Sequence, residues 1–317
     1  MKQKFHLSLF VTLSFVLALT ACKKDKETGP SQEEINAQIA AQADDEAQVS
    51  LEMDATIADA TFFLENYVDM SGAASILDQP VCDATITTDY ESDPKTVTIT
   101  YNGESCSSAK TRTGKVTISM PKDDYWMEAG TAVTITYENF KVTRTIDQKS
   151  VTINGSKTYT NITGGLTYSL YYPQSQSIRH SVTSDNISVK FNDGTARQWH
   201  IARGYELTFD QSSEDIKVAI TGLHTEGSVD NIAEWGTDRF GNAFTTTIDV
   251  PVTISFQCNQ RVTGGEVTHK TSAYSATVTF GLNINGQPVT TCPEGNYYYN
   301  VEWVGAGNKT FSATLPY

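Results

Sequence analysis

The feature that most limits the fold of this chain is a strict alternation of apolar residues with threonine, repeated many times after residue 81. TVTITY at 96–101 alternates valine, isoleucine and tyrosine with threonine, and KVTISM at 115–120 and TAVTITY at 131–137 repeat the pattern. Such alternation places apolar side chains on one face of an antiparallel sheet and polar ones on the other. β-branched threonine keeps the solvent face suited to a strand. The pattern therefore predicts an all-β domain over residues 76–317.

Glycine-containing dipeptides separate these runs and predict tight turns, because Asn-Gly and Asp-Gly supply the positive φ that hairpins need. They are Asn102-Gly103, Asn154-Gly155, Asp193-Gly194, Gly241-Asn242 and Asn285-Gly286. The short spacing leaves no room for helical crossovers between parallel strands. We expect an antiparallel meander or sandwich of about twelve to sixteen strands.

Residues 31–72 have a different pattern, which predicts one amphipathic helix before the β domain. Ser31 to Glu34 have the form of a capping box, and Gly72 is expected to end the helix. The second half, from Val49 to Asp69, has the firmer apolar spacing. We interpret the acids of this segment as a solvated helix face: Asp44, Asp45, Glu46, Glu52, Asp59 and Glu65.

The N-terminus has the layout of an export signal. Lys2 and Lys4 precede an apolar run from Leu7 to Leu19, which is too short for a comfortable transmembrane helix. Leu19-Thr20-Ala21-Cys22 follows, and this segment resembles a lipobox. The resemblance implies that residues 1–21 are a lipoprotein signal peptide and that Cys22 is the lipid attachment site. The alternative is a plain signal peptide cut near Ala21.

Residues 22–30 are charged and end in Gly-Pro, so we expect a flexible tether after the lipidated cysteine. By resemblance to lipoprotein sorting rules, Lys23 in place of aspartate implies the outer membrane, with the periplasmic or surface-facing side left open. The chain carries a net charge of −14. Such acidity gives no basic footprint for nucleic acid.

Four cysteines remain beside Cys22, in a compartment that permits disulfides. Four cysteines allow three connectivities. We favour the two local pairs, Cys82 with Cys106 and Cys258 with Cys292, because each pair flanks one hairpin-like stretch. No Cys-x-x-Cys pattern occurs, which argues against a zinc or redox site.

The layout as a whole resembles uncharacterised predicted lipoproteins of Bacteroidetes. The resemblance rests on the lipobox, the acidic helix, TVTITYNGESC with RTGKVTISM, the FNDGTARQW and ITGLHTEG stretches, and the closing segment from Cys258 to Cys292. It covers most of the mature chain. It implies an envelope location and a β-rich shape, and it carries over no catalytic residue.

The sequence contains no recognised catalytic or metal-binding motif. Asp123 and Asp124 have the character of turn residues, with acid–base catalysis as the alternative. The loop at 230–242 offers oxygen ligands near glycines that could hold calcium, although its spacing fits no known loop. We therefore expect no enzyme activity, no catalytic or metal-ligating residue and no cofactor.

Aromatic residues in turn-like stretches are the remaining candidates for binding, because exposed rings offer contact area at low entropic cost. Trp126 and Trp235 both lie in such glycine-containing stretches, and we expect them at the surface. The function expected first is a membrane-anchored envelope lipoprotein with a non-enzymatic structural or partner-binding role. The first alternative is a surface glycan-binding accessory lipoprotein, and the second is an envelope hydrolase. Expected partners are the membrane, through the lipid anchor, and envelope proteins or glycans.

Overall fold

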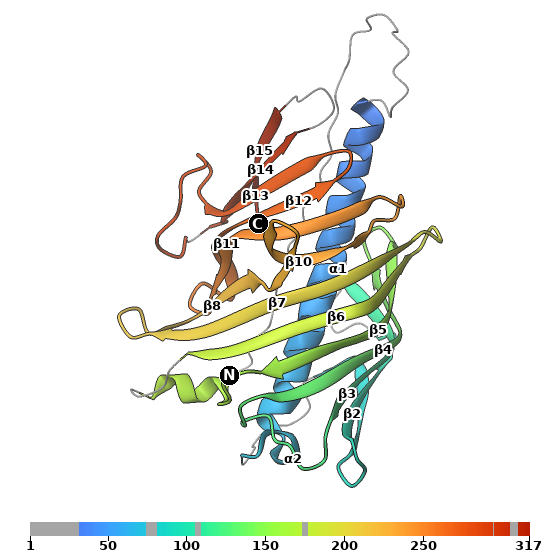
Figure 1. The fold of residues 1–317 in the computed structure, drawn as a ribbon, viewed down its shortest axis with the longest axis vertical. Helices are drawn as coiled ribbons and strands as arrows, with labels where there is room; N and C mark the ends of the chain where they lie inside the picture. Colours follow the sequence, from blue (N-terminus) through green and yellow to red (C-terminus); the bar gives the residue numbers. More distant parts are fainter. Residues whose placement is uncertain (1–31, 74–80, 105–108, 173–176, 294, 305–309) are drawn as a thin grey trace, which may run out of the picture.

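A computed structural model describes residues 32–73, 81–104, 109–172, 177–293, 295–304 and 310–317. The expected signal peptide and tether, Ser31, Cys22 and Cys106 lie outside the described residues. Two α-helices, one 3-10 helix and fifteen strands make up the described part (Figure 1). Their bounds are α1 Gln32–Asn66, α2 Val68–Ser71, β1 Ala84–Asp89, β2 Lys95–Asn102, β3 Lys110–Met120, β4 Thr131–Arg144, β5 Ser150–Asn161, η1 Thr167–Tyr171, β6 Ile178–Phe191, β7 Ala196–Asp210, β8 Asp215–Gly222, β9 His224–Glu226, β10 Val229–Thr237, β11 Ala243–Ser255, β12 Arg261–Thr271, β13 Ser275–Leu282, β14 Tyr298–Val304 and β15 Thr310–Pro316.

All the strands belong to one antiparallel sheet, which confirms the predicted all-β class with one preceding helix. Most neighbours in the chain are neighbours in the sheet, as expected of a meander. The exception is the space between β7 and β11, which two strands share. β10 pairs with one part of both strands and β8 with another part, while β9 pairs only with β10.

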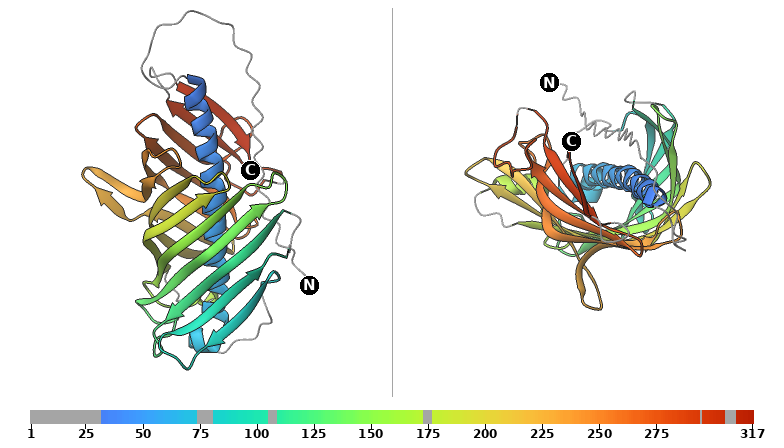
Figure 2. Two further views of the ribbon diagram at one scale, coloured as in Figure 1. Left: turned by 90° about the vertical axis from the view of Figure 1, so that its right-hand side faces the viewer. Right: turned by 90° about the horizontal axis from the view of Figure 1, so that it is seen from above.

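The sheet curves into a trough, and α1 runs along its concave side (Figure 2). Seen from above, β1 to β3 rise on one side of the helix and β12 to β15 on the other. The inward-facing residues of β2 to β7 form one hydrophobic core with α1 residues such as Val49, Met53 and Phe63. The predicted helical segment and the predicted β domain therefore share a core.

Bulges on neighbouring strands bend the sheet around the helix, as bulges generally do. The register shifts near Gly114 in β3, after Tyr137 in β4 and after Asn154 in β5. Asn154-Gly155 was expected to form a hairpin turn, and this expectation is wrong. The pair lies inside β5, where the side chain of Asn154 accepts a hydrogen bond of 2.8 Å from the backbone N–H of Asn139 at the facing bulge.

The expectation that the acids of α1 form a solvated face is also wrong for several of them. Asp45, Glu52 and Asp59 lie seven residues apart, so they recur on one side of the helix, and that side faces the sheet. Glu52 accepts a hydrogen bond of 2.7 Å from Lys110, and Asp59 lies 3.2 Å from Arg112. Asp45 is almost fully buried and pairs with Arg239. Basic residues inside the trough therefore replace water around these carboxylates.

Gly72 ends the helical segment, as predicted: it adopts φ +81° after α2, and its N–H donates to the carbonyl of Val68. α1 itself is one continuous helix of 35 residues, which at 1.5 Å per residue is about 52 Å long. We call the end of the molecule near Asn66 the distal end.

The disulfide between Cys258 and Cys292 is present, as predicted. It connects the turn after β11 to the segment before β14, and the hydroxyl of Tyr297 donates to Cys258 Sγ at 3.3 Å. Cys82 is also disulfide-bonded. Its expected partner, Cys106, lies outside the described residues, so that pairing stays a prediction.

Candidate functional site at the distal end

Trp126 is not a surface residue, and this prediction is wrong. The backbone N–H groups of Trp126 and Met127 donate to the carbonyls of Met70 and Ser71, at 2.8 and 3.1 Å. The segment forms a tight turn, in which the N–H of Glu128 donates to the carbonyl of Tyr125 at 3.0 Å. Trp126 points inward and is fully buried against Tyr159, with 4.8 Å between ring centres.

Trp235 is half-buried at the outer face of the sheet. Its indole stacks with two imidazoles, with ring centres 5.3 Å from His200 and 4.1 Å from His224 and nearly parallel planes. The protein's own imidazoles therefore take up stacking surface on this indole.

In the loop at 230–242, the carboxylate of Asp238 binds backbone N–H groups of the same loop. Asp238 is almost fully buried and accepts hydrogen bonds of 2.8 Å from the N–H groups of Phe240 and Asn242. A turn explains this carboxylate without a metal ion. Within the described ranges, no group of three His, Cys, Asp or Glu residues is arranged to hold a metal ion.

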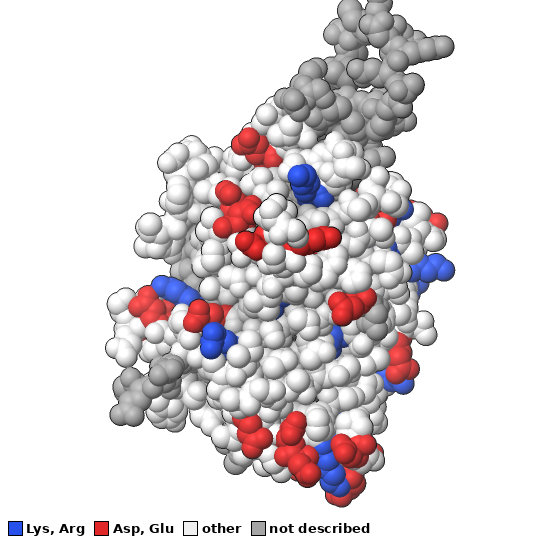
Figure 3. Space-filling view, viewed as in Figure 1, with Lys and Arg blue, Asp and Glu red and all other residues white. Residues whose placement is uncertain are grey.

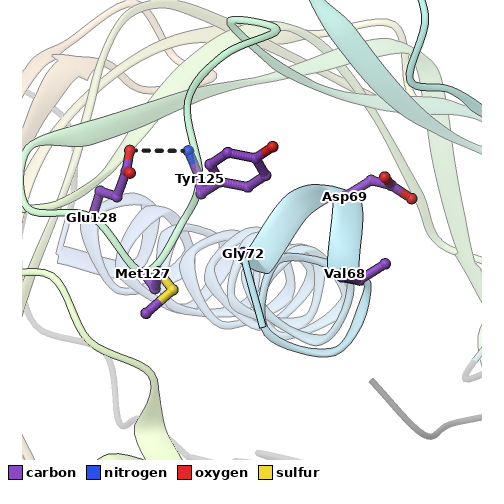
Figure 4. A pocket seen from close by; sticks show the side chains of 6 residues that line it. All are labelled: Val68, Asp69, Gly72, Tyr125, Met127 and Glu128. Carbon is purple, nitrogen blue, oxygen red and sulfur yellow. Dashed lines mark hydrogen bonds between the residues drawn. The ribbon is translucent and has the colours of Figure 1, made fainter. Parts of the chain in front are cut away.

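A shallow pocket of about 290 Å³ lies at the distal end, directly after α1 (Figure 4). Its walls come from two segments far apart in sequence: α2 with the following glycine, and the loop between β3 and β4. The lining residues are Val68, Asp69, Gly72, Tyr125, Met127 and Glu128. Trp126 is buried in the core, while its two neighbours Tyr125 and Met127 line this pocket.

Gly72 lets the two walls approach each other. A Cβ at this position would lie 3.0 Å from Cβ of Tyr125 and 3.1 Å from Sδ of Met127, closer than ordinary packing allows. The apolar side chains of the pocket remain accessible, since Val68, Tyr125 and Met127 are 51%, 39% and 42% exposed. In Figure 4, Asp69 and Glu128 lie on opposite sides of the Tyr125 ring.

Lys95 lies beneath the pocket and ties its two walls together. Its ammonium donates hydrogen bonds of 2.6 Å to the carbonyls of Asp69 and Asp124, and it lies 4.3 Å from the centre of the Tyr125 ring. Burial lowers the pKa of Lys95, and the nearby carboxylates of Asp69, Asp124, Asp123 and Glu128 oppose that shift.

These four carboxylates give the distal end a local excess of negative charge. None of them forms a salt bridge within the described part of the chain. At the lower end of the space-filling view (Figure 3), where Figure 1 places α2, acidic side chains gather and outnumber the basic side chains among them. A broad band of the outer sheet face above them carries few charges. Any ligand that approaches the pocket therefore meets a negative potential.

A second exposed group near the distal end consists of three tyrosines of η1 and its cap. Tyr168, Tyr171 and Tyr172 are 53%, 59% and 63% exposed. The carboxylate of Glu65, in the last turn of α1, accepts a hydrogen bond of 2.6 Å from Thr167 and fixes η1 to the helix. We call these three residues the η1 tyrosines.

The pocket was not predicted from the sequence, because the expected binding residue was Trp126 and its neighbours Tyr125 and Met127 were not considered. The available signal was a run of three large side chains in one short loop, Tyr125, Trp126 and Met127, since not all three can face the core. The contribution of Val68 and Asp69 could not be foreseen, because it depends on where the end of α1 meets the loop after β3.

Comparison with known proteins found no matching family model, no similar curated protein and no similar solved structure. Among the described residues, no helix is both long enough and apolar enough to cross a membrane.

Proposed function

We propose that this protein is an envelope lipoprotein, tethered to the membrane through Cys22, that binds a partner non-enzymatically with its distal end. The observation that carries the proposal is the position of the pocket. It lies just beyond Asn66, so the whole of α1, about 52 Å, separates it from Gln32, the described residue nearest the proposed anchor.

Two further observations support this arrangement. The disulfide between Cys258 and Cys292 suits an oxidising compartment outside the cytoplasm. The unpaired carboxylates at the distal end would be repelled by anionic headgroups, which favours an orientation with the pocket away from the membrane. The proposed location is the outer membrane.

The proposal is tested by site-specific photo-crosslinking in intact cells. A photo-reactive residue at Val68, on the rim of the pocket, should give a discrete crosslinked product. The same residue at Ile284 is the matched control, because Ile284 is 67% exposed in the turn after β13, on another part of the molecule. A Cys22→Ser variant should lose both membrane association and the crosslink at Val68. Equal products at both positions, or none at Val68, would contradict a distal contact surface.

A second candidate function, glycan binding at the surface, is favoured by the η1 tyrosines alone. Three exposed phenol rings within five residues can stack against sugar rings. Tyr168→Ala and Tyr172→Ala should then abolish retention of the protein on insoluble polysaccharide, while Tyr125→Ala should not. Retention that survives both substitutions would remove this candidate.

A further inference from the structure

The distal pocket combines an accessible apolar floor with a negatively charged rim. Val68, Tyr125 and Met127 form the apolar part, and Asp69 and Glu128 lie on either side of it (Figure 4). A volume of about 290 Å³ lies at the lower limit of pockets that hold drug-sized ligands, roughly 300 to 1,000 Å³. The space therefore suits one long side chain better than an extended ligand.

The charge around the pocket selects the sign of that side chain. Lys95 contacts both walls of the pocket, but the residue is only 2% exposed, and its ammonium is bound to two backbone carbonyls and lies 4.3 Å from the centre of the Tyr125 ring. It cannot neutralise a rim that faces solvent. The exposed Lys122 is bound to the carbonyl of Glu91 and does not line the pocket. The carboxylates of Asp69 and Glu128 are left to attract a positive group from outside the chain.

Long basic side chains match both parts of the pocket. Lysine and arginine lay their aliphatic stems along apolar surface while their charged ends stay in polar surroundings. A stem packed on Met127 and Tyr125 would carry its ammonium or guanidinium to the level of Asp69 or Glu128. The thioether of Met127 adapts its shape to such a stem.

We propose that the distal pocket binds a lysine or arginine side chain exposed on the surface of a partner protein. This inference rests on the proposed function and names the chemistry of the same surface. The proposed ligand is a basic segment of a protein, because a neutral sugar would gain no electrostatic attraction from the carboxylates of Asp69 and Glu128. The pocket holds a single side chain, so this contact alone gives weak affinity. A larger interface around the pocket would increase the affinity.

The test measures fluorescence anisotropy of labelled hexapeptides with the full chain, including its anchor, held in detergent. The peptides have a glycine–alanine background with one central lysine, arginine, glutamine or glutamate. The lysine and arginine peptides should bind, and the glutamine and glutamate peptides should not. Asp69→Asn and Glu128→Gln should each weaken binding about two- to fivefold, as expected for exposed ion pairs.

Glu226→Gln supplies the matched control. It removes one negative charge from an exposed residue of β9, outside the pocket. It should leave peptide affinity unchanged, whereas Met127→Ser should weaken it through the lost stem contact. Equal weakening by Glu226→Gln, or equal binding of the glutamine peptide, would overturn the proposal. So would binding of neutral maltohexaose in place of the basic peptides.

The outcome separates this inference from the proposed function. If the crosslink at Val68 forms in cells and Asp69→Asn with Glu128→Gln leaves it unchanged, the distal end contacts a partner through other chemistry. If neither the crosslink nor peptide binding appears, the distal contact surface itself is wrong.

Discussion

Lys157 of β5 donates a hydrogen bond of 3.0 Å from its ammonium to the backbone carbonyl of Met53 in α1. The lysine is fully buried between helix and sheet, 5.4 Å from the centre of the Tyr137 ring. Tyr137 in turn shares a hydrogen bond of 2.6 Å with Thr56, one helical turn after Met53. Polar contacts inside the core therefore fix α1 in one position along the trough.

The burial of Lys157 makes the stability of the protein depend on pH. Burial lowers the pKa of Lys157 to about 7 in the folded state, against 10.5 for the free side chain. Between these values the unfolded chain binds more protons, so the free energy of unfolding should rise with pH, by roughly 1 kcal/mol per pH unit. Chemical denaturation between pH 7 and 9 measures this slope. Lys157→Met should flatten it, and an unchanged slope would mean that another group is responsible.

Asp45 and Arg239 should contribute strongly to stability, because both are largely removed from water, with side chains 3% and 17% exposed. Asp45→Ala leaves the guanidinium with only the more exposed carboxylate of Asp193, 3.1 Å away, and should lower the free energy of unfolding by about 2 kcal/mol. Asp147→Ala, which removes the partner of Arg144 in an exposed turn, should cost at most about 1 kcal/mol. A double variant, Asp45→Leu with Arg239→Leu, should recover part of the loss. Additive losses would show that the two residues are not coupled.

Gly114 should tolerate no side chain at the bulge of β3. It has φ +95°, and a Cβ would lie 2.1 Å from the carbonyl oxygen of Asn139 on the next strand. Gly114→Ala should therefore destabilise the protein by more than about 2 kcal/mol. Gly194 has a similar φ of +88°, but a Cβ there would have no atom within 4 Å. Gly194→Ala therefore measures only the free-energy cost of the left-handed backbone, about 1 kcal/mol. Equal thermal unfolding of the two variants would contradict the close contact at the bulge.

The disulfide at Cys258 and Cys292 should stabilise the part of the sheet that the helix core does not reach. The bond joins residues 34 positions apart. Replacing both cysteines by serine should cost about 3 to 4 kcal/mol on the chain-entropy account of such loops. Hydrogen exchange should show the loss first in β12 to β14. Loss of protection spread evenly over β2 to β5 would argue against a local role.

The strands could be predicted from the sequence because each carries its own alternation. In β2, Val97, Ile99 and Tyr101 are buried, as the pattern required, and Lys95 is buried on the same face. The bulges could not be predicted, since Asn154-Gly155 has the same composition in a bulge as in a turn. Only the pairing of Asn154 with the backbone of Asn139 distinguishes the two.

The role of the helix acids was hidden for a related reason. A carboxylate such as Glu52 has the same place in a helical pattern whether it meets water or a cation. Its partner Lys110 lies 58 residues further along the chain, and no local pattern connects the two. The same holds for the distal pocket, which forms only when the end of α1 meets the loop that contains Tyr125. Local periodicity thus predicts elements, while sites built between elements escape it.

The cation partners of α1 also set an order of assembly. The ion pair of Asp45 cannot form before Arg239 is present, and Arg239 lies 194 residues later in the chain. A helix so close to the N-terminus is synthesised early, yet its ion pairs with the sheet are complete only after ten strands have followed it. Contacts this remote in sequence slow folding. This early helix is therefore among the last elements to complete its contacts.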